Sequence, residues 1–124
     1  MIREGSTRKT VLLWPFAFKF ARHEYGARCN KHEAELYLRN RSKRHRRLVL
    51  CPVFWCSPSG RLLIMRYATT PVTQAQANER KANAWSELDY EGPGDDEHPF
   101  EWKVSDWGVL RGKVVAVDYA TTAE

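Results

Sequence analysis

The stretch SDWGVLRGKVVAVDYA (105–120) constrains the fold of this chain more than any other segment. Alternating apolar residues stand on both sides of Arg111-Gly112, a pair typical of a two-residue β-hairpin turn. The register imposed by this turn pairs Leu110 with Lys113, Val109 with Val114, Gly108 with Val115 and Asp106 with Val117. Asp106 and Asp118 flank the hairpin, at an expected separation of about 5–8 Å. They are either solvated turn residues or the two carboxylates of a divalent-cation site.

A second strand pattern occupies VLLWPFAFKFA (11–21), where Pro15 marks a break or an edge position. In its second half three phenylalanines alternate with Ala17, Lys19 and Ala21. Because successive side chains of a strand point to opposite faces, the phenylalanines predict an aromatic core face. The opposite face is expected to carry small residues and one lysine.

Asn30 with Glu33 three residues later is a variant of the capping box, which predicts a helix over roughly 31–41. The helix runs into RNRSKRHRR (39–47), a basic segment that is a candidate contact for nucleic acid or for an acidic protein surface. Its cations are Arg39, Arg41, Lys43, Arg44, Arg46 and Arg47. The alternative interpretations are a solvated helix end, where cations favour the helix dipole, and a contact with the chain's own acidic residues.

LVLCPVFWC (48–56) and RLLIMRY (61–67) are expected strands, joined by the turn signal SPSG. A second helix is expected to begin at Thr70 or Thr73 and to end near Leu88. An acidic loop rich in glycine and proline then leads to the terminal hairpin. This order predicts an α+β fold, with a small antiparallel sheet and one or two helices.

With 124 residues, of which 43% are hydrophobic, the chain is expected to fold as one domain over 1–124. Residues 1–9 and 121–124 are expected to be flexible. No apolar run approaches the roughly 18 residues of a membrane span, and no cleavage site of a signal peptide follows the basic N-terminus. The three cysteines lack zinc-site spacing, which predicts buried thiols in a reducing compartment. We therefore expect a cytoplasmic protein without a membrane partner.

Charge is distributed unevenly along the chain. Residues 1–66 carry 15 Lys and Arg against 4 Asp and Glu, a net charge of +11. Residues 67–124 carry 5 against 11, a net charge of −6. The basic half either attracts an anionic partner or faces the acidic half of the same chain.

Two further motifs resemble those of the protein-kinase-like fold. PFEWKVSD (99–106) resembles the catalytic loop H-R-D-x-K-x-x-N, with Lys103 at the loop lysine and Asp106 at the metal-binding asparagine. DYA, which starts at Asp118, resembles the D-F-G turn that binds metal. The resemblance implies that Asp106 and Asp118 hold magnesium, and that Lys103 with Glu101 would occupy the catalytic positions.

FAFK (16–19) resembles the V-A-I-K strand of the same fold, which places Lys19 at the phosphate-binding lysine. The following helix would supply Glu33 or Glu35 as the partner of this lysine. The resemblance assigns nucleotide contacts to Ala17, Lys19, Glu33 and Met65. It also implies magnesium with ATP as the cofactor.

The chain departs from the kinase pattern at three places. Ten residues before Val11 leave no room for two strands and a glycine-rich loop, and the catalytic aspartate is either replaced by Glu101 or missing. After DYA only four residues remain, so we expect the helical lobe of a kinase to be missing. We therefore do not expect a complete protein kinase.

Three functions follow as hypotheses. The chain is similar to small kinase-like proteins encoded by bacteriophages, which implies a non-catalytic interaction protein that binds and modulates a host protein or nucleoprotein. The alternative is a minimal phosphotransferase that uses magnesium and a nucleotide. The third is nucleic-acid binding through 39–47.

Overall fold

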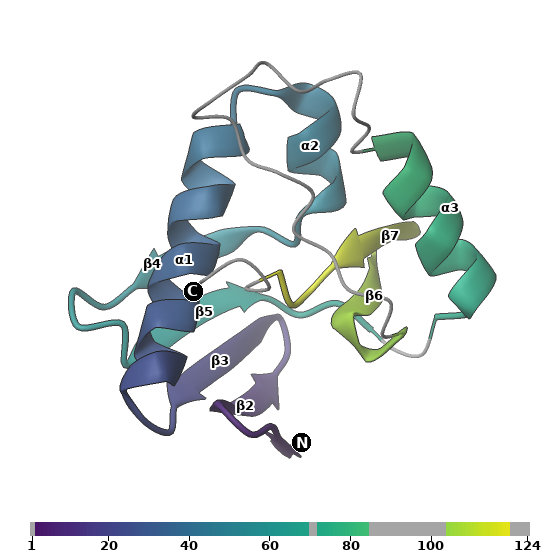
Figure 1. Ribbon diagram of the computed structural model, residues 1–124. Helices are drawn as coiled ribbons and strands as arrows, with labels where there is room; N and C mark the ends of the chain where they lie inside the picture. Colours follow the sequence, from purple (N-terminus) through teal and green to yellow (C-terminus); the bar gives the residue numbers. More distant parts are fainter. Residues whose placement is uncertain (1, 70–71, 85–103, 120–124) are drawn as a thin grey trace.

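The computed structural model describes residues 2–69, 72–84 and 104–119 and shows an α+β domain. Its strands are β1 (Ile2–Glu4), β2 (Arg8–Leu13), β3 (Phe16–Ala21), β4 (Val53–Cys56), β5 (Leu62–Arg66), β6 (Trp107–Leu110) and β7 (Lys113–Ala116). The helices are α1 (Glu24–Asn40), α2 (Arg44–Val49) and α3 (Gln74–Ala84). Strands β1 to β5 form an antiparallel sheet in the order β1-β2-β3-β5-β4, beside the separate hairpin of β6 and β7 (Figure 1). The α+β class expected from the sequence is confirmed.

Residues 2–13 form two strands joined by a turn at residues 5–7, which corrects the expectation that 1–9 is flexible. Two strands therefore do precede Lys19, although the turn between them is short. β1 pairs with β2, with Ile2 opposite Val11, and the backbone N–H of Gly5 donates to the Arg8 carbonyl at 2.9 Å. The segment 11–21 is likewise not one strand, because the chain turns at Trp14–Pro15 and β3 returns along β2. The turn lies where Pro15 predicted a break.

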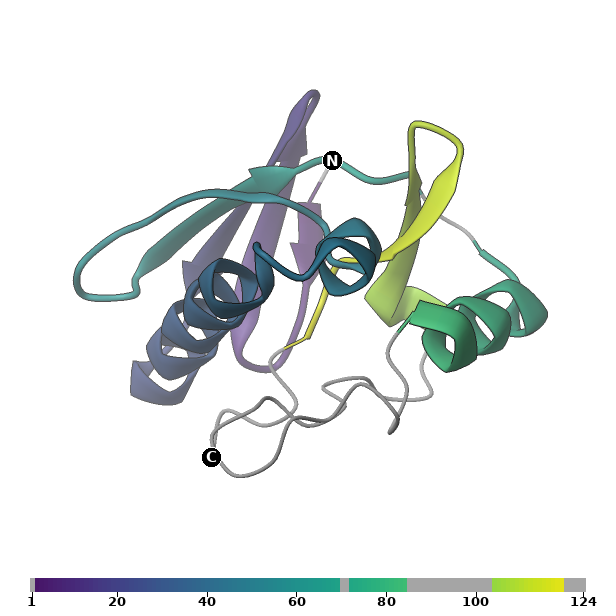
Figure 2. The ribbon, with the colours of Figure 1, turned by 90° about the horizontal axis from the view of Figure 1, so that it is seen from above.

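The side chains of β3 alternate between the two faces of the five-stranded sheet. Ala17 and Lys19 are buried on the inner face, against which α1 packs, whereas Phe16 and Phe18 lie on the opposite face and are half-buried. Figure 2 shows α1 lying along one side of this sheet. The aromatic face of β3 is therefore not the core face, which corrects the expectation from its pattern.

Helix α1 begins at Glu24, earlier than the expected start at residue 31. His23 is its N-cap, and its Nδ1 accepts a hydrogen bond from the Gly26 backbone N–H at 3.3 Å. Asn30 and Glu33 are fully buried within the helix, so they are not a capping box. Gly26 lies within α1, and the absence of a Cβ there allows the helix to approach the chain closely at Thr7.

The segment after α1 contains an additional short helix. Residues expected to start the strand 48–56 belong instead to α2, and β4 begins only at Val53. The expected turn between β4 and β5 is present, where the Gly60 N–H donates to the Ser57 carbonyl at 2.9 Å. The Thr73 hydroxyl accepts a hydrogen bond from the Gln76 N–H at 3.1 Å and caps α3. The expected end of this helix near residue 88 lies outside the described residues.

The hairpin of β6 and β7 has the register expected from the sequence, with Val109 opposite Val114 and Gly108 opposite Val115. Thr69 and Val109 exchange two backbone hydrogen bonds of 2.8 and 2.7 Å, which join the hairpin to the chain after β5. Between the inner face of the sheet, the helices and this hairpin lies the core, formed mainly by Leu36, Val49, Leu50, Leu63, Met65, Trp107, Val115 and Tyr119. None of the described helices is long and apolar enough to cross a membrane.

We expect Gly26→Ala to destabilise the fold. A Cβ at this position would lie 2.2 Å from the Thr7 carbonyl oxygen, so α1 or β2 must shift. Although alanine is favoured in helices by about 1 kcal/mol, overpacking of this kind costs about 1–3 kcal/mol. Urea denaturation should therefore show a net loss in the free energy of unfolding. The control Glu35→Ala, at an exposed position of α1, should change it by less than about 0.5 kcal/mol.

Candidate functional site

Lys19 lies on the inner face of β3 and its ammonium faces a carboxylate of α1. The Lys19 Nζ lies 3.0 Å from Glu33 Oε1 and 3.2 Å from Oε2, and it also donates to the carbonyl of Val117. The contact expected between Lys19 and Glu33 is present. Glu35, the other candidate partner, is exposed on the outer side of α1.

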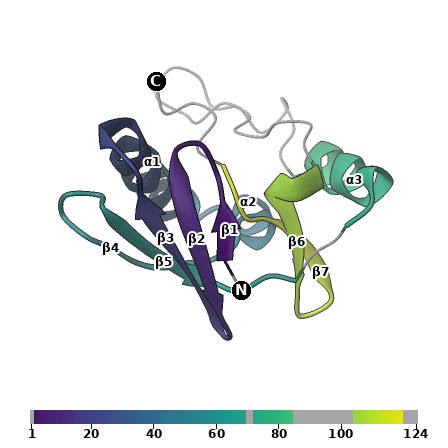
Figure 3. The same ribbon diagram turned by 90° about the horizontal axis from the view of Figure 1, so that it is seen from below.

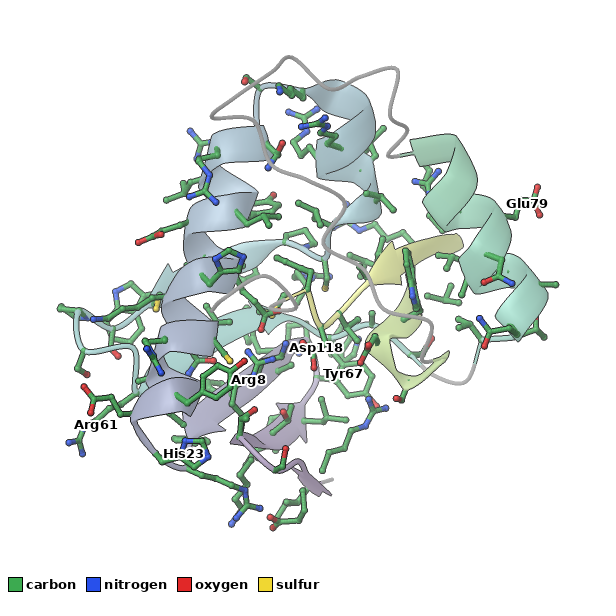
Figure 4. All side chains as sticks on the ribbon, viewed as in Figure 1. Arg8, His23, Arg61, Tyr67, Glu79 and Asp118 are labelled. Carbon is green, nitrogen blue, oxygen red and sulfur yellow. The ribbon has the colours of Figure 1, made fainter. Side chains whose placement is uncertain are left out.

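Arg8 of β2 is the second cation of the site. Its buried guanidinium donates to Glu33, to Asn30 Oδ1 at 3.1 Å and to Asp118 Oδ1 at 2.9 Å (Figure 4). Burial alone would lower the pKa of Arg8, but the carboxylates of Glu33 and Asp118 outweigh this effect, and the net pKa is raised. Arg8 is therefore a permanent cation between two carboxylates.

Arg8 was not among the site residues predicted from the sequence, because the polar character of residues 1–9 suggested a flexible end. A signal was nevertheless present, because the alternation of β2 runs back from Leu12 through Thr10 to Arg8. In the structure these residues stand opposite Ala17, Lys19 and Ala21 in register. A charged residue in phase with a buried face predicts an ion pair, since an unpaired buried charge is costly.

Glu33 is the centre of the site and is fully buried. Its carboxylate accepts hydrogen bonds from Arg8, from Lys19 and from the backbone N–H of Tyr119, the last at 3.0 Å. The Tyr119 side chain is also buried, and its hydroxyl donates to the Cys51 carbonyl at 2.9 Å. Glu33 thus joins β2, β3, α1 and the segment after β7. We call Arg8, Lys19, Glu33 and Asp118 the charge network.

A cleft of about 230 Å³ lies beside the charge network, between the inner face of the sheet and the residues that flank the second hairpin. Five residues selected from the sequence line it: Ala17, Lys19, Met65, Asp106 and Asp118. They come from β3, from β5 and from both ends of the hairpin. Arg8 forms part of the same wall.

The two aspartates were expected to hold magnesium, and their backbones are adjacent. The Asp106 carbonyl accepts hydrogen bonds from the N–H groups of Val117 and Asp118, at 2.8 and 3.3 Å. The Asp118 carboxylate, however, is bound by the Arg8 guanidinium. Within residues 2–69, 72–84 and 104–119, no group of three or more His, Cys, Asp and Glu side chains is arranged to hold a metal ion. A magnesium ion at Asp118 would have to share this carboxylate with a protein cation, and the magnesium assignment stays a prediction.

Glu101 and Lys103, assigned to catalysis by the resemblance, lie outside the described residues. Their roles remain predictions. The described part of that motif begins at residue 104 and ends at Asp106, which directly precedes β6.

The basic segment 39–47 spans the end of α1, a turn and the start of α2. Arg46 is fully buried and donates to Asn40 Oδ1 at 3.1 Å, so it is not available as a surface contact. Arg39, Arg41 and Arg47 are exposed and Lys43 is half-buried. The side chain of Arg44 lies outside the described part. One of the six expected surface cations is thus part of the interior.

The cysteines are buried or half-buried free thiols. Burial raises the pKa of Cys51 to about 12 and also raises the pKa of Cys29. The Cys51 thiol lies 3.3 Å from the Arg66 carbonyl, to which it donates. These are the properties of packed thiols rather than of nucleophiles, which need a lowered pKa and exposure.

A scan against protein-family models and searches of curated proteins and of solved structures found no match for this chain. The charge network carries two positive and two negative groups, which balance. It lies against a small cleft that opens between two parts of the chain.

We expect Arg8→Met to destabilise the protein by about 3 kcal/mol, because it removes one partner of a fully buried carboxylate. Urea denaturation of Arg8→Met, Glu33→Gln and the double variant should show coupling of about 0.5–3 kcal/mol between the two sites. The control Arg22→Met removes the half-exposed ion pair with Glu4 and should cost less than about 1 kcal/mol. Equal costs for Arg8→Met and Arg22→Met would contradict the central role of the charge network.

The thiols should differ in reactivity. At pH 8, Cys51 with a pKa of about 12 is almost entirely neutral and is shielded from solvent. Iodoacetamide should therefore label Cys51 only when the protein unfolds. The half-buried Cys56, whose pKa burial also raises, should react slowly but measurably in the native state. Peptide mass spectrometry after timed labelling, with and without urea, checks this. Rapid native labelling of Cys51 would contradict its packing.

Proposed function

We propose that this chain is a non-catalytic binding protein with a kinase-like arrangement of parts, and that it acts on a partner protein through its surface. The order of the elements along the chain supports this arrangement. Two paired strands precede Lys19 on β3, Glu33 follows on α1, and Asp118 follows a second hairpin. If the chain is phage-encoded, as its resemblance implies, the partner is a host protein or a nucleoprotein.

The position of Arg8 is the main observation that supports a non-catalytic function. Phosphoryl transfer needs cations on the phosphates and carboxylates on metal ions. Here Asp118 Oδ1 lies 2.9 Å from Arg8, and Lys19 is bound to Glu33 and to a carbonyl. Because two cations face two carboxylates, the charge network needs neither a bound phosphate nor a metal ion for its balance.

The dimensions of the site also support this proposal. The cleft of about 230 Å³ is smaller than the roughly 300–1,000 Å³ of ordinary ligand pockets. The turn between β1 and β2 covers only residues 5–7, so it is much shorter than a glycine-rich loop that covers phosphates. A nucleotide would therefore be poorly enclosed.

The second candidate is a minimal magnesium-nucleotide phosphotransferase. It is favoured by one observation, that Ala17, Lys19 and Met65 line the same cleft as both aspartates. This function would require Arg8 to leave Asp118. Nucleic-acid binding through 39–47 is the third candidate, and it would depend on exposed cations such as Arg39 and Arg47.

Thermal unfolding with and without millimolar Mg-ATP separates the first two candidates. A ligand at 100 times its Kd stabilises by about 2.7 kcal/mol, which a domain of this size reports as a rise of several degrees in Tm. For the non-catalytic protein we expect a change below about 1 °C in the wild type and in Asp118→Asn. A rise of several degrees in the wild type that is lost in Asp118→Asn would overturn the proposal and favour the phosphotransferase.

A further inference from the structure

One face of the five-stranded sheet is aromatic, and none of the helices in the described part of the chain packs on it. This open face lies opposite α1, and its centre consists of Phe16, Phe18, Phe20, Phe54, Trp55 and Ile64. In the described part of the chain, α1 is the helix that packs on β3, β4 and β5, and it does so on the other face. Figure 3 shows the molecule from below, with α1 on one side of the five strands.

The strand register builds a continuous apolar row across the open face. Val11 stands opposite Phe18, Phe18 opposite Ile64, and Ile64 opposite Trp55. Ile2 of β1 extends the row, because it pairs with Val11. The row therefore crosses all five strands, as cross-strand neighbours on one face do.

An irregularity in β4 adds a second aromatic residue to this row. The register shifts between Val53 and Trp55, so Phe54 and Trp55 both lie on the open face although they are consecutive. The Phe54 ring lies edge to face with Phe16, with ring centroids 5.0 Å apart. A bulge is a common means of redirecting a side chain next to a functional surface.

Phe16 and Phe18 are half-buried, but the other aromatic side chains of the open face are exposed to solvent. Phe54 is 57% exposed, Trp55 50% and Phe20 42%, and Trp14 at the neighbouring turn is 78% exposed. Each could bury a large apolar area against a partner. Contiguous exposed apolar patches are where proteins commonly bind other proteins.

The charges on the open face indicate what covers it. Lys9 stands opposite Phe20 and Arg66 opposite Phe16, so a cation lies near each end of the β3 aromatic residues. Glu4, on the same face, is ion-paired with Arg22. The balance of these four residues is positive, which is complementary to an acidic partner and would bring like charges together in a pair of identical faces.

Nucleic acid is a weaker fit to the same residues. Binding a single strand needs a cationic track for its backbone and open ring faces for base stacking. Here aliphatic side chains such as Val11 and Ile64 separate the aromatic residues, and the Phe16 ring packs against both Phe18 and Phe54. An apolar protein segment matches this surface better.

We propose that the open face docks an amphipathic segment of a partner protein, with an apolar side on the aromatic row and acidic residues toward Lys9 and Arg66. This inference rests on the proposed function, because it names the surface and the chemistry of the partner. Such a segment would form a layer equivalent to the one that α1 forms on the inner face.

Two synthetic peptides test the proposal with the full chain. Both are amphipathic helices of about 18 residues with leucine and phenylalanine on one side; the first has glutamate flanks and the second lysine flanks. Titration followed by calorimetry should give at least tenfold tighter binding of the glutamate peptide. The variant with Phe54→Ser and Trp55→Ser should weaken that binding at least tenfold, and Lys9→Glu with Arg66→Glu should reverse the preference.

Leu38→Ser is the matched control, because Leu38 is an equally exposed apolar residue on α1, away from the sheet. It should leave binding unchanged. Circular dichroism and Tm confirm that the surface variants remain folded. The proposal is overturned if both peptides bind equally or not at all, or if binding survives in Phe54→Ser with Trp55→Ser. Preferential binding of oligothymidylate, or a stable dimer in sedimentation, would likewise overturn it.

The result is separable from that of the Mg-ATP experiment. If the peptides fail and Mg-ATP gives no rise in Tm, the docking surface is wrong while the non-catalytic proposal stands. If Mg-ATP stabilises the wild type and the glutamate peptide binds as expected, the docking surface stands and the proposal of a non-catalytic protein falls.

Discussion

The buried carboxylate of Glu33 is the interaction on which the rest of the structure depends. A fully buried charge costs several kcal/mol unless it is paired and hydrogen-bonded. Glu33 meets this requirement with Arg8, Lys19 and the backbone N–H of Tyr119, which come from β2, β3 and the segment after β7. The first and last described parts of the chain are thereby tied to α1 by one side chain. The contacts of Glu33 therefore fix the positions of β2, β3 and the segment after β7 relative to α1.

Parts of the fold were predictable because local rules determine them. A two-residue turn at Arg111-Gly112 sets the hairpin register, and strand alternation places Ala17 and Lys19 on one face. Long-range pairing was harder to see. The burial of Arg8 and Asn30 depends on partners more than 20 residues away, so their polarity suggested a flexible end and a helix cap. The aromatic face of β3 was misassigned because sequence cannot show which face α1 covers.

The charge network also bears on the candidate site. The cleft-lining residues selected by the kinase resemblance do converge, since Ala17, Lys19, Met65 and both aspartates share one cleft. Yet the Asp118 carboxylate forms an ion pair with Arg8, whereas in a kinase the carboxylate at this position binds a metal ion. In this chain the carboxylate therefore has a structural role. Under our proposal, residues that serve transfer chemistry elsewhere hold this fold together. A motif can therefore be present in a fold without the activity that it has in other proteins.

The two faces of β3 have different roles in the domain. Lys19 on the inner face takes part in the charge network, whereas Phe18 on the open face lies in an apolar row that no described helix covers. Successive residues of one strand therefore contribute to stability and, under our proposal, to recognition. Changes on the open face would be tolerated by the fold, because Phe54 and Trp55 are half exposed and outside the charge network. A protein built this way can change its partner without rebuilding its core.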